Sequence, residues 1–265
     1  MKRFVLNNQI ELLNWLGRLQ HFKTASLYSD KLEPYNTSVI INKKKQNIKE
    51  ISELKFNLDL KEHIELLKQL IPYKMPPLQD LTFDLDKTLQ NTELLNEFLS
   101  NSICGHILTN SSCLIQVFNF RAPNSFLSIS PYMASLPKVL PLVSEAAGFR
   151  DFSLEKAEFE DLLAAAKNVK KVEISWCSIE GSGQLDFGDK LEGSTFEILD
   201  FWGTIFKSEG DDRTSFMNIV KGLAEVESVR SREVKIRSTY CKWNKKKAQE
   251  VLEKYGLTKM SLDGN

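Results

Sequence analysis

The chain lacks the features that would place it in several common functional classes. No apolar run among its 265 residues approaches the roughly 20 that a membrane-spanning helix needs. The N-terminus, MKRFVLNNQIELL, has neither an apolar stretch nor a small-residue cleavage site, so we expect no signal peptide. The formal net charge is zero, from 35 basic and 35 acidic residues, whereas nucleic-acid binders normally carry a basic excess. We therefore predict a cytoplasmic protein that neither spans a membrane nor binds nucleic acid.

Candidate metal-binding and catalytic residues are also sparse. The three histidines, His21, His63 and His106, lie far apart in the sequence. Cys104-x-His106 with Cys113 offers three soft ligands, but the spacing matches no common zinc site and a fourth ligand is not evident. Without a secretory signal, the four cysteines are expected to be reduced thiols. We predict no catalytic residue, no cofactor and no metal.

The chain does carry a spaced apolar pattern, Val169-x-x-Val172-x-Ile174-x-x-Cys177-x-Ile179. The same spacing returns at Phe196-x-x-Leu199-x-Phe201-x-x-Thr204-x-Phe206 and at Leu257-x-x-Met260-x-Leu262-x-x-Asn265. Side chains alternate between the two faces of a strand, so Val172 and Ile174 are predicted to point inward and the residue between them outward. The small polar residue three positions later lies where the chain leaves the strand and can hydrogen-bond backbone groups. One such unit cannot bury its own apolar face, so the units are expected to stack.

Earlier segments fit the same template with Asp in the polar position. They are Phe22-x-x-Ala25-x-Leu27-x-x-Asp30, Ile51-x-x-Leu54-x-Phe56-x-x-Asp59 and Leu78-x-x-Leu81-x-Phe83-x-x-Asp86. We place further strands over Phe149-x-x-Phe152-x-Leu154 and through Leu127, and assign no register to the rest of 110–145. Amphipathic helices are predicted at 9–19, 62–71, 91–100, 155–167 and 244–256. Strands and helices that alternate at this length predict a parallel sheet with helices on its outer side.

Two features interrupt the regular spacing. The polar positions Thr204 and Cys241 are 37 residues apart, against 27 in the unit before. We expect the additional residues to form a surface loop at 207–213. Pro137 and Pro141 exclude a continuous helix across their apolar segment, unless a helix begins at one of them.

The template resembles the leucine-rich repeat consensus, L-x-x-L-x-L-x-x-N/C-x-L. The resemblance extends over 149–265 and, less regularly, over 20–90, with helix-containing units similar to the ribonuclease-inhibitor class. The phrase Leu185-Asp-Phe-Gly-Asp-Lys-Leu-x-Gly-Ser, ahead of a predicted strand, is similar to a divergent group of leucine-rich-repeat-like proteins of ciliated protists. The resemblance implies an α/β solenoid with a parallel concave sheet, helices on the convex side, and a concave face that binds another protein.

We expect a single irregular leucine-rich repeat domain over residues 1–265. Residues 1–21 are predicted to form its N-terminal helical cap, 22–145 its divergent repeats and 146–265 its clearer repeats. The last predicted strand has no recognisable cap, and natural proteins usually cover an exposed sheet edge. A protein partner, either another chain or a second copy of this one, is therefore expected near 257–265.

Three aromatic residues are the candidate partner-binding anchors. Trp176, Trp202 and Tyr240 are predicted at the outward ends of neighbouring strands. Such side chains desolvate large areas at a small entropic cost. The neighbouring outward column is Glu173, Asp200, Arg237 and Ser261. Two interpretations stay open: these aromatic residues form a partner-docking patch, or they pack against adjacent loops.

Together these features predict a non-enzymatic protein–protein interaction scaffold or a structural subunit of a larger intracellular assembly. The alternative is a substrate-recognition adaptor of a ubiquitin ligase. Such an adaptor needs a recruiting module, and the helix predicted at 9–19 is short for an F-box and lacks its usual leading Leu-Pro.

Overall fold

The computed structural model describes part of the chain. The described residues are 53–57, 64, 67–68, 78–85, 92–103, 115–122, 126–181, 185–207, 212–231, 233–239, 245–254 and 260–263. Several predictions lie outside them: the helical cap at 1–21, the unit that begins at Phe22, the cysteines and histidine at 104–113, Tyr240, Cys241 and Asn265.

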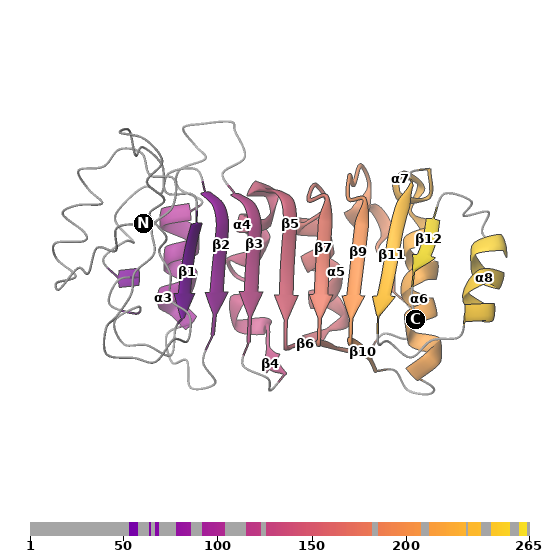
Figure 1. Ribbon diagram of the computed structural model, residues 1–265, viewed down its shortest axis with the longest axis horizontal. Coiled ribbons are helices and arrows are strands. Elements are labelled where there is room, and N and C mark those ends of the chain that lie inside the picture. The colour runs from indigo at the N-terminus through magenta and orange to yellow at the C-terminus, as the bar shows by residue number, and fades with distance from the viewer. Residues whose placement is uncertain are drawn as a thin grey trace, which may run out of the picture.

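Eight parallel strands form the main sheet, and their order in space follows their order in the chain (Figure 1). They are β1 Glu53–Asn57, β2 Leu78–Asp84, β3 Ile115–Arg121, β5 Val143–Arg150, β7 Lys171–Ser175, β9 Ile198–Trp202, β11 Val234–Thr239 and β12 Met260–Asp263. Each strand pairs in parallel with its neighbours along this order. The predicted α/β class with a parallel sheet and interleaved helices is confirmed.

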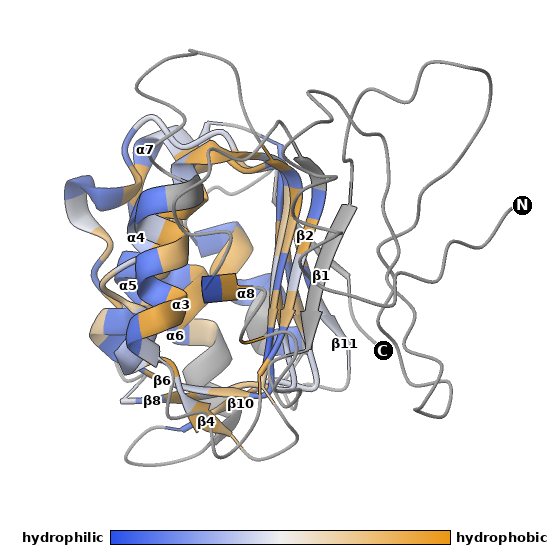
Figure 2. Cartoon of the chain, turned by 90° about the vertical axis from the view of Figure 1, so that its left-hand side faces the viewer, coloured by the Kyte–Doolittle hydropathy of each residue, from blue (hydrophilic) through white to orange (hydrophobic). Residues whose placement is uncertain are grey.

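Helices lie along one side of the main sheet (Figure 2). They are α3 Thr92–Glu97, α4 Leu136–Val139, α5 Lys156–Ala165, α6 Asp212–Glu225, α7 Glu227–Arg230 and α8 Lys245–Lys254. A π-helix, η1 Phe98–Ile103, follows α3, and short 3-10 helices lie at η3 Ser130–Tyr132, η4 Leu140–Leu142 and η5 Gly188–Leu191. The predictions at 91–100, 155–167 and 244–256 are confirmed by α3 with η1, by α5 and by α8. Pro137 and Pro141 stand in the first turns of α4 and η4, where proline is compatible with a helix.

A second, smaller parallel sheet runs along the carboxyl ends of the main strands (Figure 2). Its order is β10 Ile205–Phe206, β8 Ser178–Glu180, β6 Phe152–Glu155 and β4 Leu127–Ser128. At the bend ahead of this sheet, four successive units carry a residue of positive φ, which we call the corner residues: Phe126 (49°), Asp151 (62°), Trp176 (53°) and Gly203 (62°). Only glycine adopts this conformation freely, so the other three corner residues carry backbone strain. The strand predicted through Leu127 exists, but in this second sheet.

Two rows of inward side chains from the main strands form the core. The first row is Leu81, Phe118, Ala147, Val172, Leu199 and Ile236, and the second is Phe83, Phe120, Phe149, Ile174, Phe201 and Ser238. The Phe120 ring centroid lies 5.3 Å from that of Phe152 and 5.0 Å from that of Tyr132, so the centre of the core is largely aromatic. Ser238 is the one polar residue in these two rows. Its buried hydroxyl has no hydrogen-bond partner in the described part of the chain.

At Cys177 and Thr204, the polar position of the template links a unit to the one before it. The single S–H of Cys177 is shared between two acceptors, the Phe149 carbonyl at 3.6 Å and the Ser175 carbonyl at 3.4 Å. The Thr204 hydroxyl donates to the Ile174 carbonyl at 2.6 Å. Phe149 and Ile174 belong to the preceding strands, so the predicted role of these residues in satisfying backbone groups is confirmed at both positions. Burial raises the pKa of Cys177 to about 12, so its thiol is neutral at physiological pH.

The strand predicted over Phe149-x-x-Phe152-x-Leu154 is wrong. The main-sheet strand β5 ends one residue after Phe149, and the other two residues belong to β6 in the second sheet. Pairing with β7 makes Ala147 the inward residue that precedes Phe149. The small side chain of Ala147 gives a weak apolar signal, whereas residues from two different strands reproduce the expected spacing. Strand β3 lies in the region 110–145, to which the sequence assigns no register.

The long interval after Thr204 contains more helix than the unit before it. α6 begins at Asp212 and has 14 residues, against 10 in α5, and α7 follows it directly. The end of the predicted loop at 207–213 is therefore the first turn of a helix. No helix in the described ranges is long and apolar enough to cross a membrane.

The last strand is displaced from its predicted register. β12 pairs Leu262 with Ile236 and Asp263 with Arg237. Asp263, not Ser261, therefore extends the outward column next to Arg237. The prediction is wrong by two residues because apolar side chains at alternate positions fit either register.

Candidate functional site

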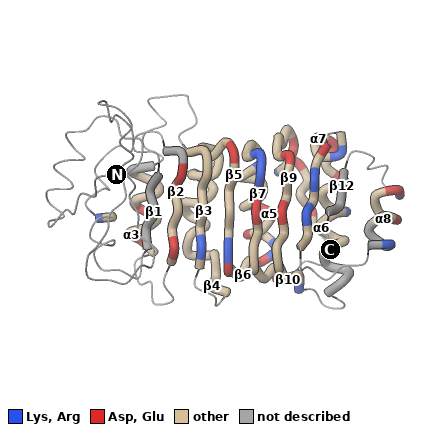
Figure 3. Tube along the Cα trace, viewed as in Figure 1, with Lys and Arg blue, Asp and Glu red and all other residues tan. Residues whose placement is uncertain are grey.

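The face of the main sheet opposite the helices carries the outward side chains. The structure places Glu173, Asp200 and Arg237 side by side on β7, β9 and β11, as the sequence predicts. Figure 3 shows acidic and basic residues interspersed along these strands. Lys171 Nζ bridges the first two carboxylates, at 2.9 Å from Glu173 and 3.2 Å from Asp200. Arg237 Nη1 lies 4.0 Å from Asp200. The column is thus a connected network of opposite charges.

The Glu173 carboxyl group is ionised at neutral pH. Burial raises its pKa, but hydrogen bonds from Lys171 and from Ser175 Oγ at 2.7 Å, with the positive charges of Lys171 and Arg121, outweigh that effect and hold the pKa below its usual range. Burial lowers the pKa of Lys171, and its bonds to Glu173 and Asp200 raise it more, so the net pKa is above the usual range. Both groups therefore keep their charges at this surface.

The two described tryptophans of the predicted patch occupy different rows. Trp202 pairs with Ser175 at the end of β9, whereas Trp176 is a corner residue beside Gly203. A Cβ atom on Gly203 would lie 2.5 Å from Cε3 of Trp176, so the indole ring rests directly on this glycine. The backbone N–H of Trp176 donates to the backbone carbonyl of Trp202 at 2.6 Å. Both side chains stay accessible, Trp176 at 43% and Trp202 at 45% exposure.

A hollow of about 320 Å³ lies in the outward face beside these tryptophans. It is lined by Asn119, Arg121, Gly148, Phe149, Arg150, Glu173, Ser175, Trp176 and Trp202. The Asn119 side chain lies against Gly148, because a Cβ atom there would be 2.7 Å from Oδ1 of Asn119. Glycine at this position therefore allows the Asn119 amide to lie close to the backbone at the hollow.

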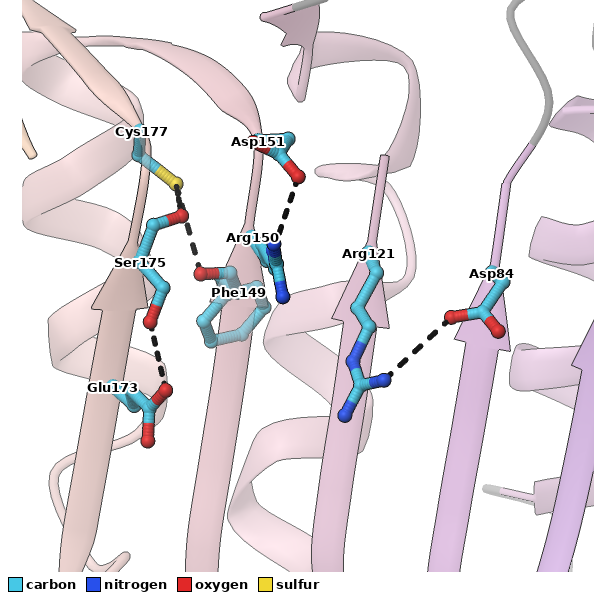
Figure 4. A network of polar contacts seen from close by, with 8 residues as sticks. All are labelled: Asp84, Arg121, Phe149, Arg150, Asp151, Glu173, Ser175 and Cys177. Carbon is cyan, nitrogen blue, oxygen red and sulfur yellow. Dashed lines mark hydrogen bonds and ion pairs between the residues drawn. The ribbon is translucent and has the colours of Figure 1, made fainter. Parts of the chain in front are cut away.

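Two arginines stand side by side at the hollow (Figure 4). Arg121 on β3 pairs in register with Arg150 on β5. Arg121 Nη1 lies 4.0 Å from Asp84, beyond hydrogen-bond distance, and Arg150 Nε donates to Asp151 at 3.2 Å. The side chains are 42% and 50% exposed. The pair therefore offers guanidinium groups that are positioned by the sheet and reachable from solvent.

The sequence interpretation missed the arginines and Gly148. Arg150 lies within the strand predicted from Phe149 to Leu154, whose register is wrong. Arg121 lies in the region 110–145, for which the sequence predicts no register. One signal was available: Ile115-x-x-Phe118-x-Phe120 fits the apolar half of the template. The polar half fails there because Pro123 takes the polar position.

No group of three or more His, Cys, Asp or Glu side chains among the described residues is arranged to hold a metal ion. Comparisons of the chain with protein-family models, curated proteins and solved structures found no match.

Proposed function

We propose that the chain is a leucine-rich repeat solenoid that acts as a non-enzymatic scaffold inside the cell, with its outward sheet face as the surface that binds a protein partner. Support for the repeat assignment comes from the parallel strand order, the two inward rows and the polar positions of Cys177 and Thr204, which link successive units. The partner-binding surface on this reading extends along the sheet toward the C-terminal edge at 257–265.

The observation that carries the proposal is the composition of the hollow. Trp and Arg are the residue types that contribute most to protein–protein binding, chiefly where they cluster at one place on a rigid surface. Here two exposed tryptophans and two exposed arginines surround one hollow, and all four are held by neighbouring main strands or their corner. Small-molecule sites are normally deeper and more apolar than this open, mixed-charge surface.

The test is Trp202→Ala, compared with wild type by quantitative recovery of bound proteins from an extract of the source cells. Trp202 is exposed, so the substitution leaves the core intact, and loss of a central aromatic anchor is expected to reduce recovery about tenfold or more. Phe126→Ala is the matched control, because Phe126 is 47% exposed and does not line the hollow. Equal recovery by Trp202→Ala and wild type would contradict the proposal.

The identity of the recovered proteins separates scaffold from adaptor. Ubiquitin-ligase core subunits would favour the adaptor alternative, whereas the subunits of a large structural assembly would favour the scaffold.

A further inference from the structure

Building on the proposed function, we propose that the hollow recognises an extended acidic segment of a partner protein. One Asp or Glu carboxylate of that segment binds between Arg121 and Arg150, and a large apolar side chain two residues along, on the same face of the segment, packs on Trp202.

The arginine pair is suited to a carboxylate. The two residues are in register on adjacent strands, about 4.8 Å apart in a parallel sheet, so both guanidinium groups can reach one anion. Among the described residues, the only hydrogen bond that either guanidinium makes is from Arg150 Nε to Asp151. The remaining N–H groups point to the forked, bidentate geometry by which Arg binds carboxylates.

The rest of the hollow favours a peptide over a free phosphate. Glu173 lines the same hollow and is ionised, so it repels a doubly charged phosphate about twice as strongly as the single charge of a carboxylate at the same distance. A peptide carries N–H donors as well as acceptors. Its backbone N–H groups can therefore bond to Glu173 or to Oδ1 of Asn119, whose Nδ2 already donates to Thr82 at 3.3 Å.

The size of the hollow and its aromatic wall define the remainder of the ligand. A volume of about 320 Å³ holds one or two side chains, not a folded surface, so the partner contributes a short extended segment. Trp202 and Trp176 border the space on the β9 side, opposite the arginines on β3 and β5. An acidic residue with a large apolar residue two positions away, on the same face of the extended segment, contacts both sides of the hollow.

The experiment is selection from a random linear peptide library by the purified full chain. Wild type is expected to enrich peptides in which Asp or Glu lies two residues from Phe, Leu, Ile or Trp, so that both side chains share one face of the extended peptide. Arg121→Gln with Arg150→Gln is expected to weaken binding of a selected peptide about tenfold or more and to remove the acidic preference. Arg121→Glu with Arg150→Glu is expected to select Lys or Arg at the same peptide position, which also shows that a doubly substituted protein folds. Arg230→Gln, an exposed arginine on α7, is the matched control and is expected to select as wild type does.

Three results would overturn this inference. Wild type could select peptides that show no enrichment of Asp or Glu and that Trp202→Ala does not bind. This result would refute the binding of a carboxylate by the arginines and leave the proposed function standing. Displacement of selected peptides by inorganic phosphate, at concentrations where acetate has no effect, would assign the arginines to a phosphate group instead. Selection of no peptide, together with unchanged partner recovery by Trp202→Ala, would refute both proposals.

Discussion

At the scale of single residues, Gly203 shows how a missing side chain positions its neighbour. It is a corner residue with φ of 62°, and the Trp176 ring occupies the space where its Cβ atom would be. Glycine is needed here for two reasons, the left-handed backbone and the contact with the indole. Gly193 meets only the first requirement, because its φ is 69° and a Cβ atom there would have no neighbour within 4 Å.

Gly203→Ala and Gly193→Ala separate these two effects. Each is expected to lower the free energy of unfolding by about 1 kcal/mol through left-handed strain. Gly203→Ala is expected to cost about 1–3 kcal/mol more, because the new methyl group must displace the Trp176 ring. Chemical denaturation measures both values, and an altered tryptophan fluorescence should accompany Gly203→Ala alone. Equal losses in the two variants would show that the ring contact contributes nothing.

The sequence predicts individual outward residues better than it predicts their neighbours. The outward placement of Trp176 and Trp202 is predictable, because each follows an inward pair of apolar residues. Arg121 and Arg150 become neighbours of the tryptophans only through strand pairing, which depends on the positions of β3 and β5. A binding site built from four strands therefore cannot be predicted until every strand has its correct register.

At the scale of elements, the polar position acts as a link between successive units. Thr204 is buried, and its hydroxyl bonds the carbonyl of Ile174 on the strand before it. Cys177 makes the same kind of contact to Phe149 one unit earlier. A buried carbonyl deprived of such a donor loses a hydrogen bond that water cannot replace.

Thr204→Val tests this link, because it keeps the shape of the side chain and removes the hydroxyl. We expect the free energy of unfolding to fall by about 1–3 kcal/mol. The control is Thr195→Val at an exposed position, which is expected to change it by about 0.5 kcal/mol at most. Thermal or urea denaturation measures both, and a Thr204→Val protein as stable as wild type would remove the hydrogen bond from our account.

The elements themselves were predictable where large apolar residues fill both inward positions. β7 and β9 have Val172 with Ile174 and Leu199 with Phe201, and both strands lie where the spacing predicts them. β5 has the small residue Ala147 at one of these positions, and the register predicted for this strand is wrong. The second sheet escaped prediction because strands of two to four residues carry too little periodicity to be distinguished from a turn.

At the scale of the whole molecule, each main strand bonds, within the described part of the chain, only to the main strands before and after it. Local damage should therefore spread along the sheet by neighbour contacts and weaken with distance. Phe120 lies in β3, where its ring meets those of Phe83, Phe118, Tyr132 and Phe152. Ile236 occupies an inward position in β11, toward the other end.

Phe120→Ala is expected to lower the free energy of unfolding by about 3–5 kcal/mol. Amide hydrogen exchange should quicken most in β2, β3 and β5 and least in β11. Ile236→Ala should give the opposite distribution, with the largest change in β9 and β11. A uniform rise in exchange across all main strands in both variants would show instead that the sheet opens as one cooperative unit.

The strand order has one further consequence, for how such a molecule changes in length. Every interior strand of the main sheet presents one edge to its predecessor and the other to its successor, in the same direction. If residues 171–197 were duplicated ahead of β9, the inserted strand would pair in parallel with β7 on one side and β9 on the other. The connections between the other strands would stay the same. We therefore expect that duplication of the gene segment for one unit would add a strand to the main sheet and widen its outward face.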